Sequence, residues 1–159
     1  MSYVEQSVVA ALLAAGTTIA TAESLTAGML SAAIANVPGA SGTLAGGVIS
    51  YNNHVKTELL GVDDAVLQEQ GAVCAQVAEQ MAAGAAARLH TDYALSTTGV
   101  AGPEPHQGKA VGTVFIGIHT PERTWAEEFS LSGSREHIRQ ATVAAALTML
   151  ARALKESAN

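Results

Sequence analysis

Residues 24–55 form a block of 32 consecutive positions without Asp, Glu, Lys or Arg, and the block is flanked by Glu23 and Lys56. A run of this length in full contact with water would carry charged side chains. The lack of charge therefore predicts that the interior of the block forms a helix and a central strand, each covered by other elements. The two charged residues at the ends of the block need a separate explanation.

Short apolar runs and helical repeats alternate along the chain. Turn-forming residues mark their ends, as at Val37-Pro38-Gly39 and at Gly61. From the spacing of the apolar residues we expect, in chain order, a helix ending at Gly16, a strand at 17–21, a helix at about 26–36, a strand at 44–51, a short helix capped by Asn53 and reaching Leu60, a helix at about 73–89, strands at 93–98, 111–118 and 124–131, and a helix at about 134–156.

The connections between the expected strands indicate how the strands run. Residues 121–123 are short enough for a hairpin, so the last two strands should be antiparallel. The earlier strands are separated by helices and should mostly run parallel, with helices on both faces of the sheet. No repeat, linker or low-complexity tail divides the sequence. We therefore expect an α/β fold with a mixed, mostly parallel sheet in a single domain, 1–159.

The composition argues against several classes of protein. Hydrophobic residues make up 48% of the chain and charged residues 14%, which disfavours disorder, and the formal net charge is −6. Nonspecific binding to nucleic acid or to an anionic membrane requires a basic surface, so a small molecule is the expected partner. The N-terminus has no signal sequence and the chain has no continuous apolar run of about 20 residues. We therefore expect a soluble cytoplasmic protein.

Cysteine and histidine offer no metal site. Cys74 is the only cysteine and has no partner nearby in the sequence, which favours a packed small residue over a nucleophile. The five histidines show neither the His-Glu-x-x-His spacing nor a neighbouring Cys-x-x-Cys pair. We therefore expect activity, if any, to be independent of metal.

The stretch TAESLTAG, residues 21–28, lies between an expected strand and an expected helix. The free backbone N–H groups at the start of a helix can stabilise an anion or a developing oxyanion. This corner therefore suits a nucleophilic serine at Ser24. Ser24 or Thr26 can equally act as a plain N-cap of the helix, and spacing alone leaves both interpretations open.

A nucleophilic serine needs a base, and none of the histidines lies in a recognisable triad context. Lys56 is more informative than Lys109, which lies in a polar loop, or Lys155, which suits the end of the last helix. Partial desolvation would lower the pKa of Lys56 and give a neutral amine that accepts a proton, whereas a close Glu23 carboxylate would raise that pKa. The alternative is a surface lysine that is solvated or paired with Glu58.

Two further segments suggest ligand contacts. TTGVAGP, residues 97–103, follows an expected strand, and Gly99 and Gly102 would let the backbone approach a ligand closely. A Gly-Pro turn at a strand end is also common without a ligand, and the segment is neither a GxGxxG nor a Walker loop. Arg135 and Arg139 are spaced i, i+4 in the last helix, where they can clamp a phosphate or carboxylate or form a solvated face with nearby acids.

Taken together, these features resemble the CinA C-terminal domain family over nearly the whole chain. The resemblance rests on motifs in the family's order and spacing, namely TAESLTAG, GGVISYNNHVKTELLGV, GAV, STTGVAGP, KAVGTVFIGI and SGSREHIRQAT. It implies a three-layer α/β/α domain. It also implies the nicotinamide-nucleotide amidase reaction of stand-alone members, in which nicotinamide mononucleotide gives nicotinate mononucleotide and ammonia, with neither metal nor other cofactor, in pyridine nucleotide recycling.

The resemblance also implies roles for individual residues. Ser24 would attack the carboxamide and Lys56 would accept its proton, giving an acyl-enzyme that water hydrolyses. Backbone N–H groups of the Ser24–Gly28 corner would bind the oxyanion. The other expected substrate contacts are Thr26, Gly28, Tyr51, Asn52, Thr98, Gly99, Gly102 and, for the phosphate, Arg135 or Arg139. The resemblance further implies a homodimer or a higher homo-oligomer.

Two positions depart from the usual family pattern. Ala27 stands where many members have the first glycine of Thr-Gly-Gly, and EPHQGKAVG replaces a longer loop that contains a diglycine. Both changes touch the expected site. The alternative is therefore a noncatalytic nucleotide-binding or regulatory domain, and release of ammonia from nicotinamide mononucleotide would distinguish the two.

Overall fold

The computed structural model describes residues 2–159. Five strands form one sheet in the order β2-β1-β3-β4-β5. The strands are β1 (Ile19–Glu23), β2 (Leu44–Ile49), β3 (Tyr93–Gly99), β4 (Thr113–His119) and β5 (Thr124–Ser130). β1 pairs in parallel with β2 and β3, whereas β4 is antiparallel to both β3 and β5. Four of the five strands therefore point the same way, which confirms the expected mixed, mostly parallel sheet.

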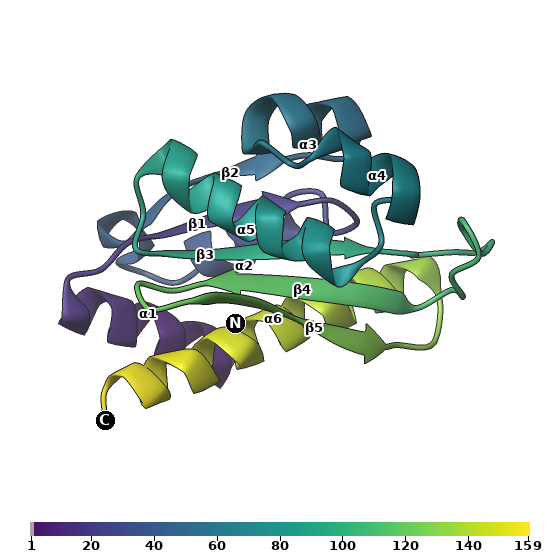
Figure 1. Cartoon of the computed structure of the whole chain (residues 1–159). Helices are drawn as coiled ribbons and strands as arrows, with labels where there is room; N and C mark the ends of the chain where they lie inside the picture. The colour runs from purple at the N-terminus through teal and green to yellow at the C-terminus, as the bar shows by residue number, and fades with distance from the viewer. Residues whose placement is uncertain (1) are drawn as a thin grey trace.

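Helices cover both faces of this sheet (Figure 1). On one face, α1 (Tyr3–Ala15), α2 (Met29–Ala35) and α6 (Arg135–Ser157) enclose one apolar core, and a short 3₁₀ helix (Ala40–Gly42) follows α2. On the other face, α3 (Asn53–Leu60), α4 (Asp64–Gln70) and α5 (Ala75–Leu89) enclose a second core. The result is a three-layer α/β/α sandwich.

The charge-free block does not contain a central strand, so that expectation was wrong. β2 lies at the edge of the sheet and exposes every second residue, Ile49 to 56%. The central position belongs to β1, whose five residues are all buried. Small residues rather than deep burial explain why β2 lacks charged side chains, because a side chain at Gly47 would clash with Thr21 on β1.

Most expected elements lie within a few residues of those observed, and two differences bear on function. The helix expected from about residue 26 begins only at Met29, because an irregular turn at 24–28 precedes it. β4 is antiparallel to β3 because a loop rather than a helix connects them. The helix at Asp64–Gln70 was not expected from the sequence.

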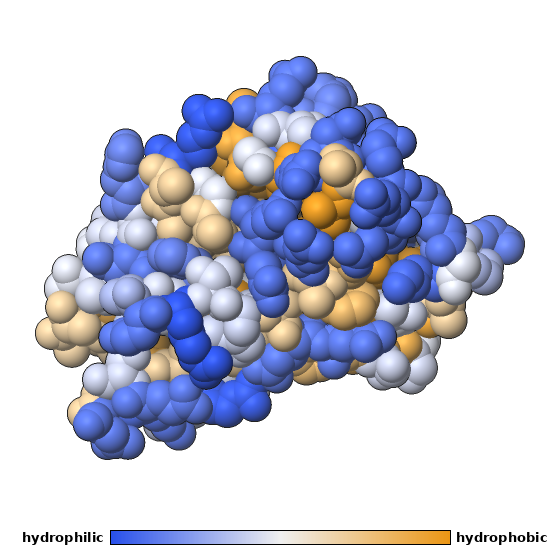
Figure 2. Space-filling model, in the orientation of Figure 1, coloured by the Kyte–Doolittle hydropathy of each residue, from blue (hydrophilic) through white to orange (hydrophobic). Residues whose placement is uncertain are grey.

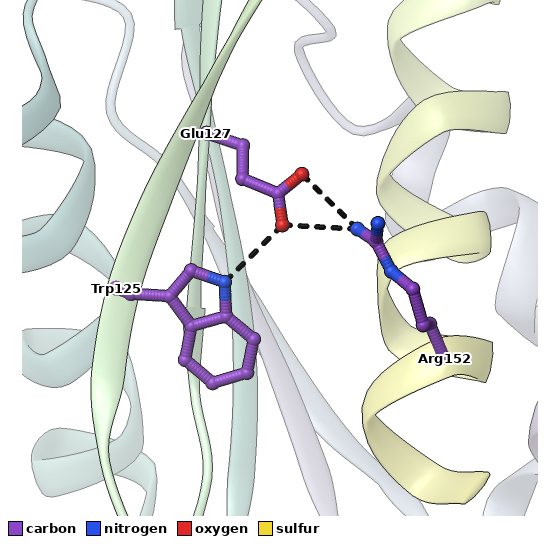
Figure 3. A network of polar contacts seen from close by, with 3 residues as sticks. All are labelled: Trp125, Glu127 and Arg152. Atoms are coloured by element: carbon purple, nitrogen blue, oxygen red, sulfur yellow. Dashed lines mark hydrogen bonds and ion pairs between the residues drawn. The ribbon is translucent and has the colours of Figure 1, made fainter. Parts of the chain in front are cut away.

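The last helix contacts β5 through polar side chains near its C-terminus. Near its C-terminus, Arg152 Nη2 donates to Glu127 Oε2 on β5 at 2.9 Å, and Trp125 Nε1 donates to the same carboxylate oxygen at 3.2 Å (Figure 3). This exposed ion pair contributes at most about 1 kcal/mol, so α6 is held mainly by its buried apolar side chains, such as Ile138 and Leu150. Its first turns then lie beside the carboxyl ends of the parallel strands.

The surface over α3, α4 and α5 is mainly hydrophilic, with apolar residues in small separate groups (Figure 2). Among the large apolar residues that are exposed, Ile49 and Tyr51 lie at the end of β2 and just beyond it. No helix within residues 2–159 is both long enough and apolar enough to cross a membrane.

Candidate active site

The carboxyl ends of the three parallel strands converge on one cavity. The chain passes from β1 to β2 through α2 on one face, and from β2 to β3 through α3, α4 and α5 on the other. A reversal of this kind opens a crevice beyond the strand ends, which is the usual ligand site of open α/β sheets. The cavity here measures about 410 Å³, within the range of small-molecule sites. Its lining includes Ser24, Tyr51, Lys56, Thr98, Gly99, Gly102 and Arg135.

Ser24 and Lys56 reach this cavity from different parts of the fold. Ser24 follows β1 directly, and Lys56 lies in the first turn of α3, which begins after β2 and its N-cap Asn52. Lys56 Nζ is 3.2 Å from Ser24 Oγ. This separation is the hydrogen-bond reach required of a nucleophile and its base.

Two backbone carbonyls orient the amine of Lys56. Nζ donates to Ser50 O at 2.7 Å and to Tyr51 O at 3.3 Å. A neutral amine has two N–H groups and one lone pair, and carbonyls can only accept. When both N–H groups bind these carbonyls, the lone pair is left for the hydroxyl proton of Ser24.

Burial favours the neutral form of Lys56. Its side chain is only 1% exposed, and desolvation lowers its pKa from 10.5 to about 8. The opposing effect of a close carboxylate is not seen, because within residues 2–159 no acid forms an ion pair with Lys56 and the Glu23 carboxylate binds elsewhere. The surface pairing with Glu58 considered from the sequence is therefore wrong.

The Glu23 carboxylate occupies the start of α2. Its two oxygens accept from the backbone N–H groups of Gly28, Leu30 and Ser31 at 2.8–3.1 Å. Hydroxyl groups of Thr21, Thr26 and Ser31 also donate to it. Glu23 is 1% exposed, and this set of donors compensates for burying its charge. The acid thus caps the helix, a role that we had considered for Ser24 or Thr26.

This cap restricts which amides can meet a substrate. The Gly28 N–H is taken by Glu23, and the Ser24 N–H donates to the carbonyl of Thr97 at 3.0 Å. The Ala27 N–H donates to the carbonyl of Ser24. In the part of the chain described, only the N–H groups of Leu25 and Thr26 in this corner donate to no protein atom. Leu25 lines the cavity whereas Thr26 is fully buried, so the expected oxyanion donors narrow to the N–H of Leu25.

The two arginines of the i, i+4 pair lie in different surroundings. Arg135 lines the cavity, where Nη2 donates to the Tyr51 hydroxyl at 2.8 Å and Nη1 to the carbonyl of Gly102 at 2.6 Å. Three of its five N–H groups remain for a ligand. Arg139 is not among the lining residues and instead binds the carbonyls of Leu25 and Thr26.

Three other expected contact residues lie outside the cavity lining. Thr26 is fully buried, and its hydroxyl is bonded to Glu23 and Thr97. Gly28 lies beyond the corner, with a left-handed φ of 102°. Asn52 caps α3 through its side chain, which accepts from the His54 N–H at 3.1 Å. These three residues therefore support the elements around the cavity without lining it.

Several residues that shape the site were missed from the sequence. Asn53, Ala72 and Val73 line the cavity. Thr97 Oγ1 is 2.8 Å from Thr26 Oγ1 and also receives the Ser24 N–H. The GAV motif at 71–73 was a usable signal for the second and third lining residues, whereas nothing local to Thr97 marks its contacts.

Within the described residues, Cys74 is a packed side chain and the histidines do not gather into a metal site. Cys74 is buried, as expected of a packed small residue, and its Sγ donates to the carbonyl of Gly71 at 3.6 Å. Among residues 2–159, no three His, Cys, Asp or Glu side chains are grouped so that they could hold a metal ion.

Known sequences give a consistent family assignment. The family model described as "CinA C-terminal domain" matches residues 1–154. A CinA-like protein of Frankia casuarinae is 45% identical over 137 residues, which are 86% of this chain and 32% of that protein. A CinA-like protein of Mycolicibacterium gilvum is 47% identical over 148 residues, which are 92% of this chain and 35% of that protein. The chain thus spans about a third of the length of these relatives.

Solved structures agree over the full length of the fold. A competence-damaged protein (CinA) superfamily protein of Klebsiella pneumoniae is 27% identical, with a TM-score of 0.93 over 96% of each chain. The competence/damage inducible protein CihA of Agrobacterium tumefaciens is 33% identical, with a TM-score of 0.90 over 98% of this chain and 99% of that one. The motifs, the sheet order and these matches all agree, and the chain belongs to the CinA C-terminal domain family.

Proposed function

We propose that this single domain is an amidase that hydrolyses the carboxamide of nicotinamide mononucleotide to nicotinate mononucleotide and ammonia. The observation that carries the proposal is the 3.2 Å contact between Ser24 Oγ and Lys56 Nζ in a cavity at the strand ends. The substrate is taken from the family resemblance. The lowered pKa of Lys56 supports the assignment of a base, because a lysine of ordinary pKa stays protonated at neutral pH.

The first chemical step forms an ester with the serine. Ser24 Oγ attacks the carboxamide carbon while its proton passes to Lys56 Nζ. The oxyanion of the tetrahedral intermediate accepts a hydrogen bond from the N–H group of Leu25. Lys56 then returns the proton to the departing nitrogen, the C–N bond breaks, and ammonia leaves.

The second step releases the acid. Lys56, again neutral, accepts a proton from water as that water attacks the ester carbon. The intermediate collapses with cleavage of the bond to Ser24 Oγ, which regains the proton, and nicotinate mononucleotide leaves. Every group that moves a proton in this scheme belongs to the Ser24–Lys56 pair, so neither metal nor cofactor takes part.

Arg135 is the proposed phosphate contact. It lines the cavity and its side chain is anchored by Tyr51 and Gly102, with three N–H groups to spare. A guanidinium with free N–H groups suits a phosphate. The Thr98–Gly102 segment would lie against the rest of the nucleotide. We also propose that the protein acts as a homodimer or higher homo-oligomer, as the family resemblance implies.

The direct test is release of ammonia. Purified protein with nicotinamide mononucleotide should yield ammonia and nicotinate mononucleotide in equal amounts, measured by coupled ammonia assay and by chromatography. Nicotinamide without the ribose phosphate should react far more slowly if the nucleotide contacts position the carboxamide. Tight binding of the nucleotide without ammonia release would favour the noncatalytic domain instead.

The pH dependence should follow the neutral fraction of Lys56. With a pKa of about 8, the neutral amine is the minor form at pH 6.5 and half of the population at pH 8. We expect kcat/KM to rise about 15-fold between these values and to level off above them. Starting at pH 6.5 keeps a nucleotide phosphate, whose second pKa is about 6, mostly doubly charged. A flat profile over this range would contradict Lys56 as the base.

Chelators should leave the activity unchanged. The proposed steps need no Lewis acid, and the sequence shows no metal-ligand spacing. We expect ammonia release after dialysis against EDTA to stay within about 20% of the untreated rate. Loss of activity that one divalent ion restores would show that a step of the scheme is missing.

A further inference from the structure

Two neighbouring asparagines at the start of α3 have different surroundings. Asn52, rather than Asn53 as expected from the sequence, caps the helix, and its Oδ1 accepts from the backbone N–H of His54 at 3.1 Å. Asn53 is the first residue of α3 and lines the cavity, whereas Asn52 does not. Over residues 2–159, no protein atom bonds to the side-chain amide of Asn53. Among the described residues that line the cavity, Asn53 is also the only one with a side-chain amide.

Asn53 and Lys56 lie on the same face of α3. Residues three apart in a helix are neighbours, with Cβ atoms about 5–6 Å from each other, and both of these residues line the cavity. Lys56 Nζ is 3.2 Å from Ser24 Oγ, so Asn53 lies beside the reacting pair, on the side of Lys56. Asn53 is exposed where Lys56 is buried. A ligand that enters the cavity can therefore reach the Asn53 amide.

The two sides of Ser24 suit different parts of an amide substrate. Leu25 lines the cavity, and among the described residues its backbone N–H donates to no protein atom, so it is free for the oxyanion. Lys56 has to return a proton to the departing nitrogen, which must therefore lie within reach of Nζ. The oxygen of the carboxamide then faces Leu25, and its nitrogen faces α3, where Asn53 lies.

A nitrogen in this place has a hydrogen to donate. In the tetrahedral intermediate, the nitrogen of a primary amide carries two N–H groups and one lone pair, and only the lone pair can take the proton from Lys56. The oxygen of a side-chain amide is a hydrogen-bond acceptor. An N–H bonded to Asn53 Oδ1 leaves the lone pair free to turn toward Nζ. An ester has an oxygen in the same place and no hydrogen to donate.

We propose that Asn53 Oδ1 accepts a hydrogen bond from the N–H of the amide that Ser24 attacks, and so selects carboxamides over esters. This inference rests on the proposed function for its nucleotide substrate and deepens it by naming the residue that recognises the leaving group. Asn53 moves no proton and instead orients the nitrogen that Lys56 protonates. Its loss should slow acyl transfer from amides and leave acyl transfer from esters unchanged.

The experiment compares two substrates that donate the same acetyl group. p-Nitroacetanilide leaves through a nitrogen with one N–H, and p-nitrophenyl acetate leaves through an oxygen. In both cases Ser24 Oγ bonds to the acetyl carbon and its proton passes to Lys56. The C–N bond then breaks as Lys56 protonates the aniline nitrogen, or the C–O bond breaks and p-nitrophenolate leaves. We expect Asn53→Ala to slow release of p-nitroaniline, and of ammonia from nicotinamide mononucleotide, about 30-fold, and release of p-nitrophenolate less than about twofold.

Two further variants control the comparison. Asn53→Asp keeps an oxygen acceptor of the same size, but its carboxylate raises the pKa of the neighbouring Lys56. It is therefore measured at about pH 9, where most of wild-type Lys56 is neutral, and should keep the amide rates within about fivefold of wild type. Asn36→Ala, at an exposed position at the end of α2, should leave all rates unchanged. Circular dichroism melting checks folding, and if Asn53→Ala does not fold, Asn53→Leu, of similar size and without an acceptor, takes its place.

Two outcomes would overturn the inference. Equal slowing of the ester and the amides would make Asn53 an oxyanion donor or a structural residue. A raised KM for nicotinamide mononucleotide at unchanged kcat would make it a contact to the rest of the nucleotide. A wild type that cleaves both acetyl substrates but releases no ammonia from the nucleotide would refute the proposed function alone, and the ratio of anilide to ester rates would still decide the role of Asn53. A wild type that cleaves none of the three would overturn both.

Discussion

Replacing Ser24 by alanine is expected to lower kcat for ammonia release by about 10⁴-fold or more, because no other group in the proposed scheme can form the acyl intermediate. The cavity, the corner and Lys56 stay in place, so the nucleotide should still bind. The measurement is the rate of ammonia release from nicotinamide mononucleotide, with binding followed by calorimetry. We expect the Kd of the variant to match the wild-type KM within about threefold.

Interpreting the Ser24→Ala result requires that the variant is folded and that a control substitution of another serine is measured beside it. The Ser24 hydroxyl has Lys56 Nζ as its side-chain partner within residues 2–159, so its removal should barely change the melting temperature. Ser41→Ala, at an exposed position in the short 3₁₀ helix, should keep full activity. If folded Ser24→Ala retains most of the wild-type turnover, the nucleophile is a different residue.

Replacing Lys56 by arginine is expected to lower kcat about 10³-fold or more, although the positive charge is kept. A guanidinium stays protonated and cannot accept the serine proton. It is also larger, and the 1% exposed site of Lys56 leaves little room for it. Lys56→Ala should fail as well, which would separate the loss of the base from a clash. Both variants are measured by ammonia release at pH 8, where half of wild-type Lys56 is neutral.

Lys155→Arg, at an exposed position near the end of α6, is the matched control and should keep its activity. Near-normal turnover of Lys56→Arg would mean that position 56 supplies only a positive charge. The base would then be sought first at Tyr51, whose hydroxyl accepts from Arg135, and at His54, whose ring contacts Asn52.

The sequence predicted the layers of the fold better than the details of the corner. Apolar spacing is local, so it located all five strands and the hairpin of β4 and β5. Apolar spacing did not give the order of the strands. The uncharged sequence of β2 suggests a buried central strand, whereas its glycines allow close approach to β1 at the edge of the sheet. It also missed α4, a short helix of seven residues.

The contacts of Glu23 were the least predictable part of the candidate site. In the sequence, Glu23 reads as the end of an uncharged block and as a possible partner of Lys56. In the structure, its carboxylate accepts hydrogen bonds from backbone N–H groups five to eight residues further along the chain. That arrangement requires the irregular turn at 24–28, whose left-handed residues carry no unambiguous sequence signal. Arg139 was assigned to a ligand for the same reason, since its partners lie in that turn.

The arrangement of the two chain ends bears on how this domain can be combined with others. Figure 1 shows α1 and the end of α6 side by side on one face of the sheet. Within the described residues 2–159, the cavity lining includes no residue of α1 and none from the second half of α6. Extra sequence attached at either end would start outside the cavity and leave its wall of strand ends and loops intact. The same domain can therefore serve alone or as one module of a longer polypeptide, without a change in the residues that form the candidate site.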